Sequence, residues 1–303
     1  MDRDTGQRAR HIAWLGSSEG STALLGGKAA SIDRLLRLGI RTPPAFCLTT
    51  EAFRSHLLDG PLAGRVQAAF AALPDEGARA SLVTLVTGER LGLELAAELS
   101  AGLDRLRFER RADPTLGELL AVRSSAVGED SATSSYAGMH DTELGVADSE
   151  VEAAVKRCWA SLWSERAVEY RLMRKLPLHG EAMAVVVQAL VPARAAAVVF
   201  TRHPVTGRTD QVLVEAALGF GEAIVSGEVT PDSYLVDKVG RTVLQREPGS
   251  RAADSDALTD DQLHDLVTLS LSIEERYGAP VDIEAAHAGG HWYILQARPI
   301  TTH

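Results

Sequence analysis

The spacing of apolar and polar residues changes in character near residue 180. Before that point helical spacing dominates, and it predicts a short helix over 28–38 and two or more helices within 63–106. After it, short apolar runs separated by turn residues predict strands at 183–191, 196–201, 211–217 and 233–236. This order predicts an α+β fold in two lobes, residues 1–180 and 181–303.

Two capping boxes and one further apolar run complete the predicted elements before the final strands. A Ser-x-x-Glu box at 149–152 precedes an amphipathic stretch that continues to about Lys175, and a Thr-x-x-Gln box at 259–262 precedes one that ends at Gly278. Each box predicts the start of one continuous helix. The run Leu119–Arg123 predicts a short strand that delivers an arginine into a loop rich in hydroxyl groups.

The last two predicted strands, 281–286 and 292–297, form a hairpin. Side chains alternate between the two faces of a strand, so the length of the connecting loop decides which residues share a face. The glycines at 289–290 are compatible with a two-residue loop and, if His291 is added, with a three-residue loop.

The two loop lengths lead to different chemistry. The shorter loop pairs Glu284 with Leu295, whereas the longer loop sets Glu284 opposite Gln296. The longer loop also sets Asp282 opposite Arg298, so that two carboxylates, an amide and a guanidinium share one face. Oxygen ligands of this kind suit magnesium, and a guanidinium beside them suits a phosphate. A cross-strand salt bridge on a solvated face explains the same spacing equally well.

Composition and charge narrow the classes of function. The 303 residues carry 31 Lys and Arg against 41 Asp and Glu, and the net charge of −10 argues against a nucleic-acid surface or an anionic membrane as partner. The longest apolar runs are too short to span a bilayer, and the first residues lack the apolar core of a signal peptide. Cys47 and Cys158 have no metal-ligand spacing, which indicates reduced thiols. These features predict a cytoplasmic enzyme.

Three further segments suit a polyphosphate, although each also has a plain structural explanation. Gly-Gly-Lys at 26–28 opens the first predicted helix and would attract an anion, but a glycine turn with a solvated lysine fits as well. Arg123 leads into the loop 128–142, which suits either closure over phosphates or an ordinary surface loop. Glu215 precedes a Gly-x-Gly turn, which by itself is weak evidence for a ligand site.

Taken together and in this order, the motifs resemble the nucleotide-binding domain of the family of phosphoenolpyruvate synthase, pyruvate phosphate dikinase and rifampin phosphotransferase. The resemblance covers nearly the whole chain and implies an ATP-grasp fold, in which two subdomains sandwich ATP. The segments that carry it are Leu25–Ser31, Pro43–Thr50, Ala121–Ser125, Tyr136–Thr142, Phe200–Gly207, Gly219–Glu222, Val281–Glu284 and Leu295–Thr301.

The resemblance implies a role for individual residues. Lys28 and Arg123 match the cations that bind the phosphates, and Arg298 matches the guanidinium on the transferred phosphates, so these three are the implied catalytic residues. The implied ATP-binding residues are Gly138, Met139 and Thr142 in the small loop over the phosphates, Gln188, Ala189 and Leu190 in the hinge that reads adenine, and Glu215 near the ribose.

The same resemblance implies Mg²⁺ as a cofactor beside ATP. Glu284 and Gln296 match the magnesium ligands, and Asp282 matches a supporting carboxylate. These three, together with Arg298, are the residues that the longer hairpin loop would bring to one face.

No segment of the chain matches the phosphohistidine segment of the swivelling domain that follows in the multidomain relatives. The resemblance therefore implies a phosphotransferase that passes a phosphoryl group from ATP to a histidine on a separate partner chain or in a missing domain, with AMP and phosphate as end products. The alternatives are direct transfer to a small molecule such as an antibiotic, ligase-like activation of a carboxylate, and a non-catalytic ATP sensor.

Overall fold

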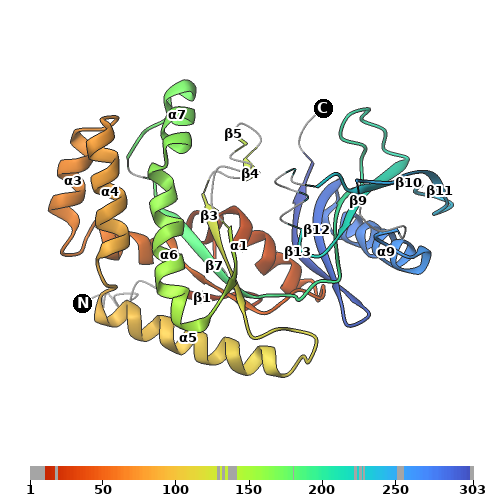
Figure 1. The fold of residues 1–303 in the computed structure, drawn as a ribbon, viewed down its shortest axis with the longest axis horizontal. Helices are drawn as coiled ribbons and strands as arrows, with labels where there is room; N and C mark the ends of the chain where they lie inside the picture. Colours follow the sequence, from red (N-terminus) through yellow and green to blue (C-terminus); the bar gives the residue numbers. More distant parts are fainter. Residues whose placement is uncertain are drawn as a thin grey trace, which may run out of the picture.

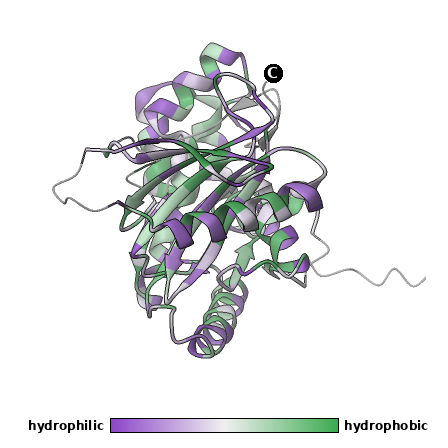
Figure 2. Ribbon diagram, turned by 90° about the vertical axis from the view of Figure 1, so that its right-hand side faces the viewer, coloured by the Kyte–Doolittle hydropathy of each residue, from purple (hydrophilic) through white to green (hydrophobic). Residues whose placement is uncertain are grey.

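The chain forms two larger antiparallel sheets side by side, with helices packed on both (Figure 1). Gly138 and Met139, two of the expected ATP-binding residues, lie outside the described part of the chain. Hydrophobic residues dominate the strands, and the helices mix hydrophobic and hydrophilic residues (Figure 2). The computed structural model describes residues 11–17, 20–127, 130–131, 134–135, 142–179, 181–221, 224, 227, 229–250 and 256–300.

The first sheet has five strands, all antiparallel to their neighbours. A two-stranded ribbon, β4 (Asp130–Ser131) with β5 (Ser134–Ser135), lies between β3 and β6 in the sequence. The strand order of the sheet is β1 (Ile12–Trp14), β2 (Ala45–Leu48), β7 (Met183–Ala189), β3 (Leu120–Ala126) and β6 (Thr142–Val146).

Helices cover both faces of the first sheet. Helix α1 (Thr22–Arg37) packs Leu25, Ala29 and Ile32 against one face. A larger core on the other face includes Phe53 and Trp159 and draws on five helices, so the sheet lies between two apolar layers. The helices after α1 are α2 (Thr50–Leu57), α3 (Ala63–Ala71), α4 (Glu76–Gly88), α5 (Leu93–Arg111), α6 (Val151–Ala160) and α7 (Glu165–Arg174). None of the described helices is both long and apolar enough to cross a membrane.

In the described part of the chain the second sheet has six antiparallel strands, and α9 (Asp260–Tyr277) covers one of its faces. Burial alternates along β9, where Val212, Val214 and Ala216 are buried in the core that includes α9. The residues between them are half-buried, so the face away from α9 is partly open. The strand order is β11 (Val243–Glu247), β10 (Asp232–Asp237), β9 (Gln211–Leu218), β8 (Ala195–Phe200), β12 (Val281–Ala288) and β13 (His291–Pro299).

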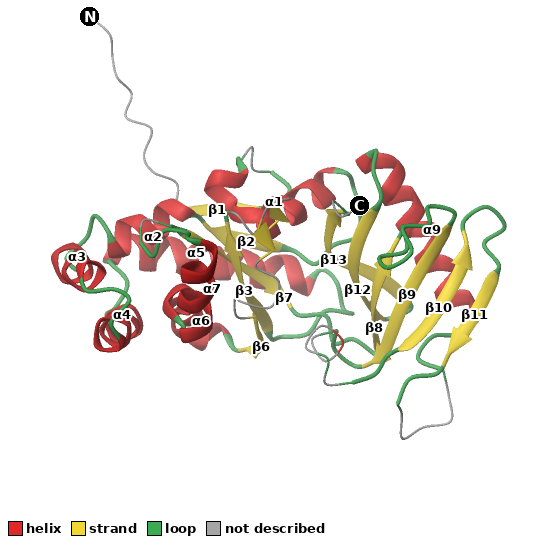
Figure 3. Cartoon of the chain, turned by 90° about the horizontal axis from the view of Figure 1, so that it is seen from above, coloured by secondary structure: helices red, strands yellow, loops and turns green. Residues whose placement is uncertain are grey.

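Helix α1 contacts both sheets and lies beside each of them in Figures 1 and 3. While its first half packs on the first sheet, Leu35 belongs to the core of the second. The hydroxyl of Ser31 donates to the carbonyl of Ala297 in β13 at 2.5 Å and accepts the amide hydrogen of the same residue at 3.1 Å. One helix therefore links the sheets that carry the two halves of the expected site.

Most predicted elements are confirmed, including the helix from Thr259 to Gly278 with its capping box. The chain passes from the first sheet to the second between Ala189 and Ala195, which is later than the expected boundary at residue 180. Strand β7 lies between β2 and β3 and is buried on both faces. Its apolar sequence therefore completes the first sheet rather than beginning the second.

The helix predicted from 149–152 to about Lys175 is wrong in its continuity. Helix α6 ends at Ala160, and α7 begins only after Ser164, whose hydroxyl accepts a hydrogen bond from the amide of Ala167 at 3.2 Å. A serine cap of this kind satisfies an amide at a helix start and so favours a new helix. The predicted capping box at 149–152 is also absent: no side chain caps α6, and the Glu152 carboxylate accepts hydrogen bonds from Lys156 and from the amide of Leu91.

Helix α1 contains a sharp break at Gly26, which has a φ of 72° and a ψ of 176°. A Cβ at this position would lie 2.0 Å from the carbonyl oxygen of Ser125 in β3. The hydroxyl of Ser125 bridges the break, because it donates to the carbonyl of Leu25 at 2.8 Å and accepts from the amide of Ala29 at 3.0 Å. The continuous part of the helix therefore begins at Gly27 and Lys28, beside β3.

Substitution of Gly26 by alanine should lower the free energy of unfolding by about 3 kcal/mol or more, because it adds a backbone clash to the cost of a left-handed conformation. Gly39→Ala is the matched control, since Gly39 has a φ of 70° and no atom lies within 4 Å of the position that its Cβ would take. The control should lose only about 1–2 kcal/mol. Urea denaturation of both variants measures the difference, and equal losses would contradict the close approach to Ser125.

Candidate functional site

The final hairpin pairs Glu284 with Gln296, as the magnesium hypothesis requires, but this pairing comes from a β-bulge and not from a three-residue loop. The connecting turn has two residues, Gly289 and Gly290, with Ala288 opposite His291. A β-bulge then shifts the register between Glu284 and Ala285. The extra residue on β13 is Leu295.

This bulge restores the pairing that a two-residue loop alone would lose. Glu284 lies opposite Gln296, and Asp282 lies opposite Arg298. A bulge adds one residue to one strand, so every later side chain on that strand moves to the other face. Of the two loop lengths considered, the shorter one is present, and the juxtaposition of these four residues that the longer loop would give arises through the bulge.

Arg123 reaches from β3 of the first sheet to the hairpin of the second. Its Nη2 donates to Oε2 of Glu284 at 2.7 Å and to Oε1 of Gln296 at 3.3 Å. Its Nη1 donates to the carbonyl of Leu295, the bulge residue, at 3.3 Å. The Arg123 side chain is 9% exposed and that of Glu284 31% exposed, so this ion pair is largely shielded from water. A shielded ion pair of this kind fixes the two sheets relative to each other.

The two oxygens that contact Nη2 fit a hard cation. A carboxylate oxygen and an amide oxygen from neighbouring strands both contact Nη2 of Arg123. A metal ion would use the same two oxygens. Magnesium accepts one or two such protein ligands and completes its shell with water and phosphate oxygens. Among the described residues no group of three or more His, Cys, Asp or Glu side chains is placed to hold a metal. Any cation here would therefore depend on ligands from outside the protein.

Asp282 and Arg298 form the second pair on this face. Nε and Nη2 of Arg298 lie 2.9 and 2.8 Å from Oδ2 of Asp282. Asp282 is 12% exposed, whereas Arg298 is 40% exposed. The carboxylate thus orients a guanidinium that remains accessible to an anion. Asp282 therefore contacts Arg298 in this structure, and its supporting role at a metal stays a prediction.

Glu215 lies on the same open face, two strands away from Glu284. Val198 of β8 is opposite Glu284 on one side and opposite Glu215 on the other, so all three point to one face. The next residue in this row is Ser233 of β10. Burial raises the pKa of the Glu215 carboxyl above its ordinary value.

The expected adenine hinge lies where β7 ends and the chain crosses to the second sheet. The buried side-chain amide of Gln188 donates to the carbonyl of Pro43 at 3.2 Å, and the amide of Ala189 donates to the carbonyl of Pro44 at 3.0 Å. The amide of Leu190 donates to Leu119 at 3.1 Å. Gln188 therefore serves to anchor the segment before β2, which its sequence position did not indicate.

The remaining expected residues group around β3. Thr142 is the first residue of β6 and is the register partner of Arg123. Lys28 is half-buried at the start of the unbroken part of α1. Its neighbour Ala29 is hydrogen-bonded to Ser125, two residues from Arg123. The structure thus places Lys28 on the helix beside β3 and Thr142 on the strand beside it, and Arg123 of β3 itself donates hydrogen bonds to the hairpin.

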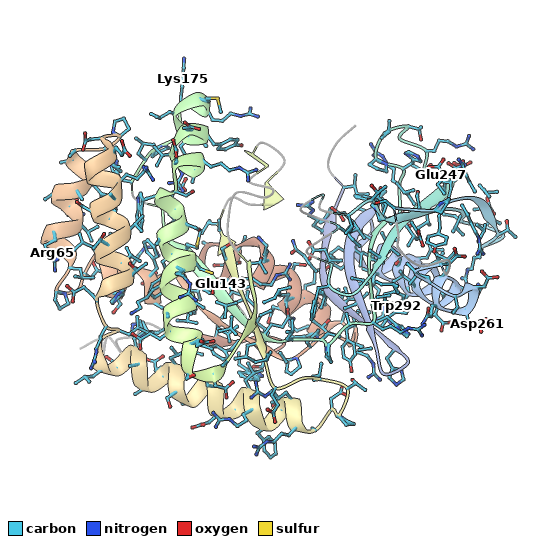
Figure 4. All side chains as sticks on the ribbon, viewed as in Figure 1. Arg65, Glu143, Lys175, Glu247, Asp261 and Trp292 are labelled. Carbon is cyan, nitrogen blue, oxygen red and sulfur yellow. The ribbon has the colours of Figure 1, made fainter. Side chains whose placement is uncertain are left out.

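Two functional features could not be found in the sequence. The carbonyl of Leu295 and the hydroxyl of Ser125 both position site residues, and neither carries charge. Ser125 belongs to one of the matching segments, but its position opposite the glycine break depends on the tertiary fold. In Figure 4, the Glu143 label lies on β6, the strand next to β3, and the Trp292 label lies on β13.

Comparisons with known proteins bear on the family to which the chain belongs. The family model described as pyruvate phosphate dikinase, AMP/ATP-binding domain, matches residues 22–303. The prodigiosin synthesizing transferase PigC of Serratia marcescens is 38% identical over 92% of the chain and 32% of its own length. A rifampicin phosphotransferase of a Streptomyces species is 38% identical over 92% of the chain and 34% of its own length. A probable phosphoenolpyruvate synthase of Methanocaldococcus jannaschii is 34% identical over 98% of the chain and 27% of its own length.

Two further observations complete the comparison. The chain spans about a third of the length of these curated relatives. Among solved structures, the D-alanine-D-alanine ligase of Helicobacter pylori matches 73% of the chain and 61% of its own length, with 10% identity and a TM-score of 0.28. On the strength of the family match over residues 22–303, the chain belongs to the family of the pyruvate phosphate dikinase AMP/ATP-binding domain, with the α+β, ATP-grasp architecture that its motifs predict.

Proposed function

We propose that this chain binds ATP with Mg²⁺ and cleaves it as the nucleotide-binding unit of a dikinase-type phosphotransferase. One observation carries the proposal: Arg123 of the first sheet contacts both Glu284 and Gln296 of the second. A cation and two oxygen ligands, drawn from different sheets and partly shielded from water, suit a charged polyphosphate held between them. Membership of an ATP-binding family supports the identity of that polyphosphate.

The protein's contribution to phosphoryl transfer would be positioning and charge neutralisation. Lys28 and Arg123 would contact the phosphates from the first sheet, and Arg298 would contact the transferred phosphates from the second. The three cations would offset the repulsion between the phosphates and a chain whose net charge is −10.

Glu284 and Gln296 would hold Mg²⁺, with Asp282 supporting through Arg298. The ion would supply charge neutralisation and a bridge between phosphate oxygens. The oxygens that would bind it are those that Arg123 contacts in this structure. Arg123 would therefore exchange these contacts for the phosphates when nucleotide and metal enter.

The remaining assignments complete the nucleotide site. The end of β7 and the residues after it, 188–190, would contact adenine, and Glu215 would contact the ribose from the open face of the second sheet. Thr142, next to Arg123, would belong to the small loop over the phosphates together with Gly138 and Met139.

The acceptor would be a histidine on a partner chain or on a further domain, and AMP and phosphate would be the end products. The greater length of the relatives supports this, because about two thirds of each lies outside the matched region. Direct transfer to a small molecule is the second candidate. The 38% identity to a rifampicin phosphotransferase favours it, because the name of that relative gives an antibiotic as its acceptor.

Phosphorus NMR of the purified chain with Mg²⁺ and ATP, with and without a swivelling-domain partner, tests the proposal. AMP that appears only with the partner supports it, ADP with a modified small molecule supports the second candidate, and tight ATP binding without turnover contradicts both.

Glu284→Gln should reduce metal-dependent turnover by at least about 100-fold, because it removes the charged ligand. Glu247→Gln, on the exposed edge strand of the same sheet, is the control and should keep full turnover. Unchanged turnover in Glu284→Gln would remove the site assignment.

A second prediction concerns competition between Arg123 and the metal. Arg123→Met should strengthen binding of Mg²⁺ alone about five- to tenfold, because Glu284 and Gln296 lose a competing cation, while binding of ATP weakens. Arg110→Met is the matched control: Arg110 is equally buried but is paired with Asp148, away from the site. Titration calorimetry of Mg²⁺ and of ATP measures both effects. Weaker Mg²⁺ binding in Arg123→Met would show that the guanidinium does not compete.

A third prediction separates stability from binding at Glu215. Because its folded pKa is raised, the ionised carboxylate opposes folding above that pKa, and this cost disappears as the pH falls below the unfolded value. Glu215→Gln should therefore raise the melting temperature more at about pH 7 than at about pH 4. The same substitution should weaken ATP binding. A gain in stability with unchanged ATP affinity would place Glu215 outside the nucleotide site.

A further inference from the structure

Tyr293 lies on β13, three residues before Gln296. Its side chain contacts the segment that connects α5 to β3 of the first sheet. The residue is 1% exposed. Its hydroxyl donates to Oδ2 of Asp113 at 2.5 Å and contacts the hydroxyl of Thr115. Both partners belong to the segment between α5 and β3, so one hydroxyl joins the metal-ligand strand to the N-terminal half of the chain.

Further hydrogen bonds hold the Asp113 carboxylate in the orientation that accepts from Tyr293. Its other oxygen, Oδ1, accepts from the amide of Thr115 at 3.1 Å and from the hydroxyl of Thr115 at 2.7 Å. Burial by itself would raise the pKa of Asp113, but the hydrogen bonds from Thr115 and Tyr293, with Arg41 nearby, lower it below its usual value. The carboxylate is therefore ionised and fixed in orientation when Tyr293 contacts it.

The segment that carries Asp113 also holds the expected adenine hinge. The amide of Gly117 donates to the carbonyl of Leu190 at 3.3 Å, and the amide of Leu190 donates to the carbonyl of Leu119 at 3.1 Å. Tyr293 packs in one small apolar cluster with Val191, the residue after the hinge. The hinge and β13 thus contact the same short segment from two sides.

A second connection runs in parallel. The amide of Ile294, next to Tyr293, donates to the carbonyl of Arg41 at 2.9 Å. Arg41 precedes the two prolines whose carbonyls accept from Gln188 and Ala189. At the hairpin tip, a Cβ on Gly289 would lie 2.2 Å from Thr115, so the turn itself touches the segment. The β12–β13 hairpin is therefore docked on the hinge supports, and Tyr293 supplies the hydrogen bond to a charged group.

We propose that Tyr293 is a positioning residue that sets the spacing between the adenine end and the metal end of the nucleotide site. The proposal rests on the function proposed above. Through Asp113 and residues 117–119, Tyr293 fixes the hinge, and through β13 it fixes Gln296 and Arg298. The bulge at Leu295 places Tyr293 and Gln296 on the same face, although they are three residues apart. A ligand that spans both ends gains from the fixed spacing, whereas a ligand that occupies only one end does not.

The test compares two ligands in two matched variants. Tyr293→Phe removes only the hydroxyl. Tyr234→Phe is the control, because Tyr234 is 2% exposed on the same sheet and donates to Asp232 at 3.1 Å, within its own half of the chain. Calorimetry measures the dissociation constants of adenosine and of a non-hydrolysable ATP analogue with Mg²⁺, and a melting curve measures stability.

Tyr293→Phe should weaken binding of the magnesium–analogue complex about tenfold and that of adenosine by less than about twofold, because a hydrogen bond to a charged group is lost between the two ends. Tyr234→Phe should leave both constants unchanged. In the double variant Tyr293→Phe/Asp113→Asn, the loss should be smaller than the sum of the losses of the two single variants, since the two residues share one hydrogen bond.

Other outcomes overturn the inference. If Tyr293→Phe weakens both ligands equally, or lowers the melting temperature without changing either constant, Tyr293 has a structural role only. If the wild-type protein binds adenosine and the magnesium–analogue complex, and Tyr293→Phe binds both with the same constants, the inference is refuted. The proposed function is unaffected by that result. Wild-type protein that does not bind the magnesium–analogue complex refutes the proposed function itself.

Discussion

The ion pair between Arg123 and Glu284 is the contact on which the rest of the site depends. It joins residues 161 positions apart in the chain and belongs to both sheets, so it positions the two halves of the site relative to each other. A shielded pair of this kind contributes little net stability, but removal of Glu284 would leave the buried Arg123 charge without its carboxylate, which costs about 3–5 kcal/mol for a fully buried charge. The pair therefore acts mainly to specify an arrangement. It also keeps a carboxylate and an amide oxygen pointed at one place before any ligand arrives.

The supports around this pair are mostly uncharged. Ser125 fills the break in α1, Ser31 ties the same helix to β13, and Tyr293 ties β13 to Asp113. These groups use hydroxyl contacts rather than further ion pairs, so they link the elements around the site without adding charge to it. This division suits an acidic protein, in which each positive charge near the site counts against a background of excess negative charge.

The sequence allowed much of the site to be predicted, because alternation along strands is local. Glu284 and Asp282, two residues apart on one strand, had to share a face. The bulge at Leu295 could not be predicted, because an inserted residue has no compositional signature. Ser164 carried a helix-start signal, which the longer amphipathic period concealed. The hydrogen bond from Tyr293 to Asp113 spans 180 positions, and no periodic pattern reports contacts at such separations.

The bulge at Leu295 has a consequence for how this strand tolerates change. Upstream of it, Trp292 packs toward α9, where its indole nitrogen donates to the carbonyl of Gln262 at 3.0 Å. Downstream, Gln296 faces the first sheet. Replacement of Leu295 by another apolar residue would keep both orientations, since its backbone carbonyl contacts Arg123 and its side chain packs on the small apolar cluster that includes Tyr293. Deletion of one residue at this point would turn Gln296 and Arg298 toward the face that α9 covers. Every side chain of the site would still be present, but these two would no longer face Arg123 and Asp282. At this point of the strand, the number of residues therefore matters more than their identity.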